Sequence, residues 1–208
     1  MNAALLALGV GLTQGLLHSV GPDHCAAIAT LGGGNDRRRA FHIALRFAGS
    51  HVFVLASLTG VCLGAGIFIS AAFERWAEIL GGAVLVSVAT AALFFPSALS
   101  HGHPHWPGHA RTHGHAGATM AAGALMAFSG IRALLLSLAP MWVGSSFHAH
   151  AWAYLPGFSL GILLGMSTVG LLAAEAFSRL GARARILAYR GTVAASAGLG
   201  LVWMAQRV

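Results

Sequence analysis

The chain has 208 residues, of which 57% are hydrophobic and only 8% are charged, and its mean hydropathy is +0.75. About a quarter of the residues in a soluble domain are charged, so this composition excludes an ordinary soluble protein. The formal net charge of +7 comes from twelve arginines and five acids. Because the arginines lie mainly in short links between apolar runs, we attribute the charge to membrane topology and expect no nucleic-acid partner.

Six apolar segments follow one another along the chain, each near the ~20 residues that cross a bilayer core. We therefore expect an all-α, polytopic membrane protein with about six transmembrane helices and a single membrane domain, 1–208. The 28 glycines and many alanines favour close contacts between such helices. The predicted segments run at about 3–31, 41–70, 77–95, 120–143, 153–178 and 186–206.

The first segment contains the sequence GLLHSVGPDHCAAIATL, in which His18, Asp23 and His24 interrupt an apolar run. In a straight helix His18 and Asp23 would lie about 500° apart around the axis, and so not on one face. Proline lacks the N–H that a helix interior needs, so we predict a kink or break at Gly21-Pro22 that lets the three side chains converge. The alternative is that His18 caps a helix end, Asp23 is an N-cap and His24 is a first-turn residue.

The second segment contains His51 within the sequence GSHVFVLASL. Ionisable side chains at membrane depth are costly and are candidates for function. Imidazole and carboxylate groups bind borderline divalent metals, so we predict a metal site formed by His18, Asp23, His24 and His51. The alternative for His51 is a histidine that is hydrogen-bonded to a neighbouring helix.

Two cysteines, Cys25 and Cys62, fall in apolar segments and form neither a CxxC motif nor a disulfide framework. A small buried thiol is the common state of such a residue, although Cys25 is adjacent to His24 and offers a soft ligand. A thiol-redox membrane conduit that uses Cys25 and Cys62 is therefore one alternative function.

A polar loop at 97–118 separates the third and fourth segments. Prolines and glycines within it argue against a stable helix, and its composition suits a flexible, secondary metal-binding tract. A solvated linker is the alternative. The tract holds six of the twelve histidines, namely His101, His103, His105, His109, His113 and His115.

The basic residues predict the orientation. The first, third and fifth links contain or adjoin Arg37, Arg38, Arg39, Arg111, Arg179, Arg183, Arg185 and Arg190. The second and fourth links and the two termini carry only Arg75 and Arg207. By the positive-inside rule the odd links face the cytoplasm, so the histidine-rich loop is cytoplasmic and both termini are outside. We expect an integral protein of a bacterial inner membrane.

The motif H-x4-D-H in HSVGPDH resembles the signature of the nickel/cobalt transporter superfamily, the NiCoT and NicO group, which includes nickel/cobalt efflux proteins and urease or hydrogenase accessory permeases. GSHVFVLASL is similar to the family's second-segment pattern at Gly49 and His51, and the histidine-rich loop resembles that of the efflux members. The resemblance implies that His18, Asp23, His24 and His51 are ligands on the transport path. The chain is shorter than the family's importers, and it has Ser-Gly-Ile-Arg at 129–132, where efflux members often have a proline-rich segment.

We therefore expect a secondary transporter of a divalent transition metal, with nickel or cobalt first and zinc or copper as alternatives. The chain has no phosphate-binding G-x-x-x-x-G-K-S/T motif, so transport is secondary or needs a separate energising subunit or a metallochaperone. We expect no enzymatic activity and no tightly bound cofactor. A membrane accessory or sensor protein for metal homeostasis is the other alternative. The sequence leaves the metal, the direction of transport and the oligomeric state open.

Overall fold

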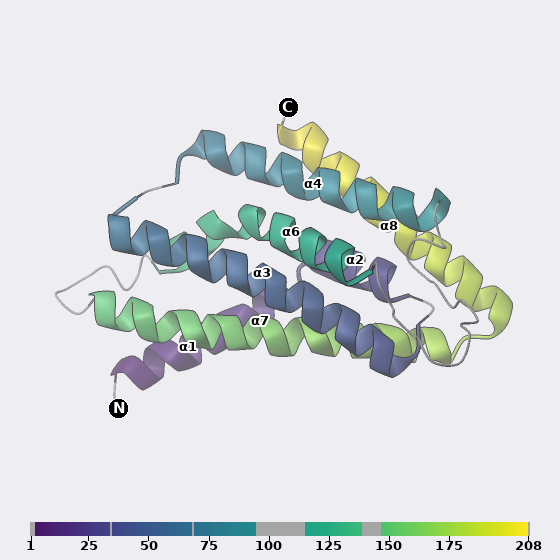
Figure 1. Cartoon of the computed structure of the whole chain (residues 1–208), viewed down its shortest axis with the longest axis horizontal. Coiled ribbons are helices and arrows are strands. Elements are labelled where there is room, and N and C mark those ends of the chain that lie inside the picture. The colour runs from purple at the N-terminus through teal and green to yellow at the C-terminus, as the bar shows by residue number, and fades with distance from the viewer. Residues whose placement is uncertain (1–2, 34, 68, 95–114, 139–146, 208) are drawn as a thin grey trace, which may run out of the picture.

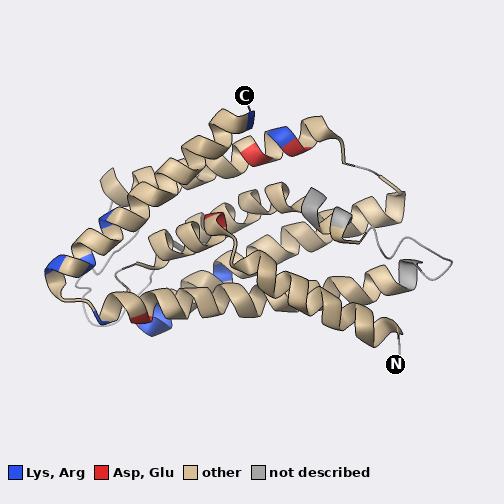
Figure 2. Cartoon of the chain, turned by 180° about the vertical axis from the view of Figure 1, so that it is seen from behind, with Lys and Arg blue, Asp and Glu red and all other residues tan. Residues whose placement is uncertain are grey.

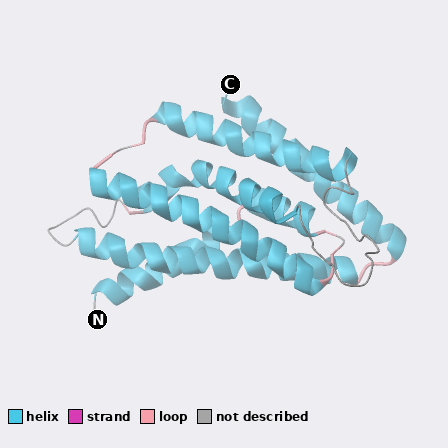
Figure 3. Cartoon of the chain, in the orientation of Figure 1, coloured by secondary structure: helices cyan, strands magenta, loops and turns pink. Residues whose placement is uncertain are grey.

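A computed structural model of the chain describes residues 3–33, 35–67, 69–94, 115–138 and 147–207. The regular structure of these residues is entirely α-helical, which confirms the predicted fold class for this part of the chain (Figure 3). The helices are α1 (Ala3–Ser19), α2 (Pro22–Gly32), α3 (Arg37–Ala65), α4 (Ala71–Phe94), α6 (His115–Ser137), α7 (Phe147–Ser178) and α8 (Ala182–Arg207).

The first apolar segment is broken where the sequence predicts. Helix α1 ends at Ser19, α2 begins at Pro22, and the two helices are bent by 62°. Proline suits the first turn of α2 because that position has no carbonyl partner for an N–H. The N-cap of α2 is Gly21, so the alternative assignment of Asp23 as the N-cap is wrong.

Helix α3 is shifted towards the N-terminus relative to the predicted segment 41–70. It begins early because Asp36 caps it, with the Arg39 backbone N–H donating to Asp36 Oδ1 at 2.9 Å. It ends at Ala65 because Gly66 has a φ of 64°, the left-handed conformation that terminates many helices. The prediction missed the first residues of the helix because they are polar, and the limits were predicted from hydrophobic residues.

The other boundaries move for similar reasons. The link predicted before position 77 is helical, so Glu74 lies in the first turn of α4. Helix α6 begins at His115, within the predicted loop 97–118. Residues 97–114 of that loop, with its other five histidines, lie outside the described residues.

Four helices, α3, α4, α7 and α8, are by length and composition able to cross a membrane. The bent pair of α1 and α2 passes the same test jointly, which raises the number to as many as five. Helix α6 contributes a shorter apolar stretch, Ala116–Ile131. The described helices are therefore compatible with an integral membrane protein, and their lengths allow four or five spans rather than establishing the predicted six.

The helices run along one common direction, and successive long helices point in opposite directions (Figure 1). Helices α1 and α7 lie on one side of the bundle, α4 and α8 lie on the other, and α3, α6 and α2 lie between them. Helices α3, α6 and α8 start at one end of the bundle, and α1, α4 and α7 start at the other. This alternation brings the ends of the helices that flank the first, third and fifth links to the same end of the bundle.

Glycines allow the two outer helix pairs to pack with their backbones in contact. In the pair of α1 and α7, a Cβ atom at Gly11 would collide with the carbonyl oxygen of Tyr154, and one at Gly157 would collide with that of Leu8. In the pair of α4 and α8, Gly82 and Gly200 face each other in the same way. Such contacts between small residues are the usual means by which helices associate in lipid.

The charged residues concentrate at the two ends of the bundle (Figure 2). We call the end where α3 and α8 begin the basic end, because it carries Arg37, Arg38, Arg39, Arg179, Arg183 and Arg185. There Glu175 pairs with both Arg37 and Arg179. We call the opposite end the terminal end, and there Arg207 pairs with Glu78. Asp23 is the one acid of the chain that is not at either end.

Candidate metal centre

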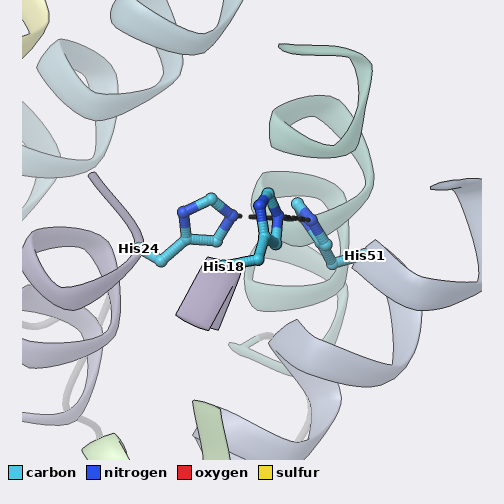
Figure 4. Close-up of side chains that lie close together, drawn as sticks. All are labelled: His18, His24 and His51. Atoms are coloured by element: carbon cyan, nitrogen blue, oxygen red, sulfur yellow. Dashed lines mark hydrogen bonds between the residues drawn. The ribbon is translucent and has the colours of Figure 1, made fainter. Parts of the chain in front are cut away.

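Three histidines from three helices meet in the middle of the bundle (Figure 4). His18 lies in the last turn of α1, His24 in the first turn of α2, and His51 at the centre of α3. The break between α1 and α2 brings the first two together, because it turns the start of α2 back towards the end of α1. Helix α3 supplies the third ring from a separate part of the chain.

The Nε2 atoms of the three rings point at one another. His51 Nε2 lies 3.4 Å from His18 Nε2 and 3.5 Å from His24 Nε2. The three potential ligand atoms all lie within 4.8 Å of one another. His51 is fully buried, His24 is 3% exposed and His18 is half-buried. Among the described residues, this is the one group of at least three histidine, cysteine or acidic side chains with such spacing.

The contacts of the Nδ1 atoms of His51 and His24 indicate which nitrogen of each ring carries the lone pair. His51 Nδ1 lies 3.1 Å from the carbonyl oxygen of Gly123 on α6, so Nδ1–H donates there and Nε2 is left as an acceptor. His24 Nδ1 lies 2.7 Å from Asp23 Oδ2, and the nearby carboxylate favours a proton on Nδ1 and thus the neutral tautomer with its lone pair on Nε2. In these tautomers the Nε2 lone pairs of His24 and His51 face each other at 3.5 Å, an arrangement that a cation between them would stabilise.

Asp23 takes a different place from the one that the sequence suggested. Its carboxylate is buried, with 4% of the residue exposed, and it lies against Nδ1 of His24 rather than among the three Nε2 atoms. The contact is close, but it is not an aligned hydrogen bond. Carboxylates in this position are common partners of metal-binding histidines, because they hold the ring in one orientation and raise its basicity.

Two glycines leave room for these side chains. A Cβ atom at Gly21 would lie 2.7 Å from Asp23 Oδ1 and 3.3 Å from His24 Nδ1. A Cβ atom at Gly130 on α6 would lie 3.2 Å from His18 Cε1. In the sequence, Gly130 stands out only as a departure from a family pattern, and Gly123 does not stand out at all. No local signal identifies either residue, because both act on rings from other helices.

The remaining predicted residues lie apart from this centre or outside the described part of the chain. Cys25 and Cys62 are free and half-buried, and neither belongs to the group of converging ligand atoms. Gly49, which matches the family's second-segment pattern, has open space where its Cβ would be. The side chains of His101, His103, His105, His109, His113 and His115 are outside the described residues.

Comparisons with known proteins identify no relative. No protein-family model, no curated protein and no solved structure matches the chain.

Proposed function

We propose that this chain is a secondary transporter of a divalent transition-metal cation, and that His18, His24 and His51 bind the cation within the membrane. The observation that supports this most strongly is the convergence of three Nε2 atoms, from the last turn of α1, the first turn of α2 and the centre of α3, inside an apolar helix bundle. Burial of these polar rings at membrane depth is costly, and such groups commonly mark an ion path.

The ligand atoms restrict the class of cation. Imidazole nitrogen suits nickel, cobalt, zinc and copper, whereas magnesium and calcium prefer oxygen ligands. The nearby Asp23 carboxylate offsets part of the charge of a divalent ion without occupying a ligand position. The resemblance of HSVGPDH to the nickel/cobalt transporter superfamily makes nickel or cobalt our first choice, and zinc and copper are the alternatives.

The proposed topology has six spans, with α1 and α2 as one broken span and α6 as the fourth. The alternating helix directions support it, because they bring the ends of the helices that flank the first, third and fifth links to the basic end. The positive-inside rule then places the basic end and the histidine-rich loop in the cytoplasm of a bacterial cell, with both termini outside. In this arrangement the loop collects or buffers the cation on the cytoplasmic side.

The test measures binding and flux separately. Purified protein is titrated with Ni²⁺, Co²⁺ and Zn²⁺, and the same preparations are placed in vesicles that contain a metal-sensitive dye. We expect His18→Ala, His24→Ala and His51→Ala each to abolish flux, and each to abolish the saturable binding that remains once residues 101–115 are deleted. His42→Ala is the matched control, since His42 is an exposed histidine on α3. Wild-type protein that neither binds nor moves any of the three ions contradicts the proposal.

Two further variants separate the alternatives. A sensor or accessory protein that works through its loop predicts that deletion of residues 101–115 abolishes the metal response while His51→Ala preserves it. A thiol conduit predicts that Cys25→Ser with Cys62→Ser abolishes function. A transporter that uses the three histidines predicts that both of these variants still move the ion.

A further inference from the structure

Two phenylalanine rings pack against the three histidines. Phe47 on α3 is fully buried, and its ring is nearly parallel to that of His51, at 14° with the ring centroids 6.2 Å apart. The same ring meets His24 edge-on, with the centroids 6.4 Å apart. Phe158 on α7 is 5% exposed, and its ring centroid lies 5.6 Å from that of His18. Each histidine ring is therefore in contact with an apolar ring.

The two phenylalanines lie on opposite sides of the histidines along the bundle. Phe47 precedes His51 by one helical turn, and because α3 starts at the basic end, Phe47 lies on that side. The backbone of Phe158 lies against Gly11 and Gly15, which precede His18 on α1. Because α1 and α7 both start at the terminal end, Phe158 lies on the terminal side of the histidines.

The terminal side has a second ring behind the first. Tyr154 precedes Phe158 by one turn of α7 and is fully buried, and the two rings are stacked at 22° with their centroids 5.7 Å apart. The Tyr154 hydroxyl lies 2.9 Å from the hydroxyl oxygen of Ser137 on α6, so this ring is tied to a neighbouring helix. On the terminal side, the histidines are therefore followed by a stacked pair of aromatic rings, whereas Phe47 is the ring on the basic side.

We propose that Phe47 and Phe158 are the two gates of the ion path, with Phe47 closing the histidine site from the basic end and Phe158 closing it from the terminal end. This inference rests on the proposed transport function. Closely packed apolar rings leave no room for water or for a hydrated cation, so each ring must move before an ion can pass its side. One gate on each side allows the site to open to one side of the membrane at a time.

The test places a thiol reporter at the site and does not require metal. His51→Cys is introduced with Cys25→Ser and Cys62→Ser, and the protein is reconstituted into vesicles. A charged, membrane-impermeant thiol reagent is then added outside or trapped inside. Arg183→Cys, introduced separately in the same cysteine-free background, reports which side the basic end faces.

We expect the reporter at position 51 to react slowly from both sides while both rings are present. Phe47→Ala should accelerate the reaction from the basic side alone, and Phe158→Ala from the terminal side alone. The increase should be at least about tenfold, because truncation of a buried ring leaves a cavity on the path. Phe177→Ala is the matched control, because Phe177 is a buried phenylalanine on α7 whose ring packs against Tyr189. It should change neither rate.

Equal rates in the Phe47→Ala, Phe158→Ala and Phe177→Ala backgrounds would overturn the gate proposal, as would acceleration from the same side by both of the first two variants. If an alanine variant unfolds, the corresponding leucine variant provides the comparison. With His51 restored, the double variant Phe47→Ala/Phe158→Ala should convert saturable Co²⁺ flux into a non-saturable leak. Wild-type protein without metal binding would refute the transport function, whereas the thiol rates would still decide whether the two rings limit access.

Discussion

At the scale of single residues, Asp23 and Gly123 orient two of the three imidazoles. Neither residue places an atom among the three converging Nε2 atoms. The Asp23 carboxylate contacts His24 Nδ1, and the Gly123 carbonyl accepts a hydrogen bond from His51 Nδ1. The supporting groups therefore come from α2 and α6, and each leaves a ring nitrogen free for a cation. Removing a supporting group should therefore weaken metal binding less than removing a ligand does.

Asp23→Asn tests this difference. Removal of the charge should weaken Ni²⁺ or Co²⁺ binding by about 10–100-fold, the usual effect of losing a carboxylate that supports a ligating histidine. His24→Ala should weaken binding further, because it removes a nitrogen from the site. Competition with a metal-binding dye measures both affinities. An Asp23→Asn loss as large as that of His24→Ala would show that Asp23 is itself a ligand.

Gly130→Ala tests the space around His18. The added Cβ would lie 3.2 Å from His18 Cε1 and 3.5 Å from His18 Nε2, so the ring must shift by a few tenths of an ångström. We expect roughly tenfold weaker metal binding, equivalent to about 1.4 kcal/mol, with little change in thermal stability. Gly49→Ala is the control, because open space surrounds its Cβ position. Unchanged affinity in Gly130→Ala would show that the His18 ring adapts freely.

At the scale of helices, the break at Gly21-Pro22 and the contact between α1 and α7 act together. The break turns α2 so that His24 approaches His18, and the glycine contacts hold α1 against α7. Because α1 packs mainly on α7, its position depends strongly on this contact. Changes to the contact should affect stability, although its glycines lie away from the histidines.

Gly157→Ala tests the contact between α1 and α7. The new Cβ would collide with the carbonyl oxygen of Leu8 and would lie 3.1 Å from the Leu12 nitrogen, so the two backbones must separate. Overpacking of this kind costs about 1–3 kcal/mol, and the thermal unfolding midpoint in detergent should fall. Gly9→Ala on the partner helix α1, which has open space at its Cβ position, should leave the midpoint unchanged. Equal midpoints in the two variants would contradict the proposed packing.

At the scale of the whole molecule, the bundle is electrically asymmetric. Six arginines gather at the basic end, and the terminal end has the paired Glu78 and Arg207. This asymmetry should determine how the chain is inserted, because cytoplasmic links retain arginine. The end of α4 and the start of α6, which flank the histidine-rich loop, both lie at the basic end.

The predicted orientation can be measured with single cysteines in a cysteine-free background. Thiols at Arg38 and Arg183 should be protected from an impermeant reagent in intact cells, and one at Asn2 should react. Permeabilised cells, in which all three should react, provide the control. Reaction of all three positions in intact cells, or protection of all three, would contradict an even number of spans.

The apolar segments were readable from the sequence because each crossing of lipid requires hydrophobic residues that are continuous along the chain. The break at Gly21-Pro22 was also readable, since proline acts on its own turn. The limits of α3 were less accurate, because its cap at Asp36 and its left-handed Gly66 lie outside the hydrophobic pattern. The sequence also picked out His18, His24 and His51 as unusual residues for a membrane segment.

Only the tertiary structure decided how these residues meet. It brings His51 Nε2 to the other two rings, places Asp23 at Nδ1 of His24, and introduces Gly123 and Gly130 from α6. These relations depend on the rotation and axial offset of each helix against its neighbours. Small residues spaced along several helices set those offsets jointly, so no local pattern contains them. The sequence by itself determined the helices and the unusual histidines, and packing between helices determined the centre that they form.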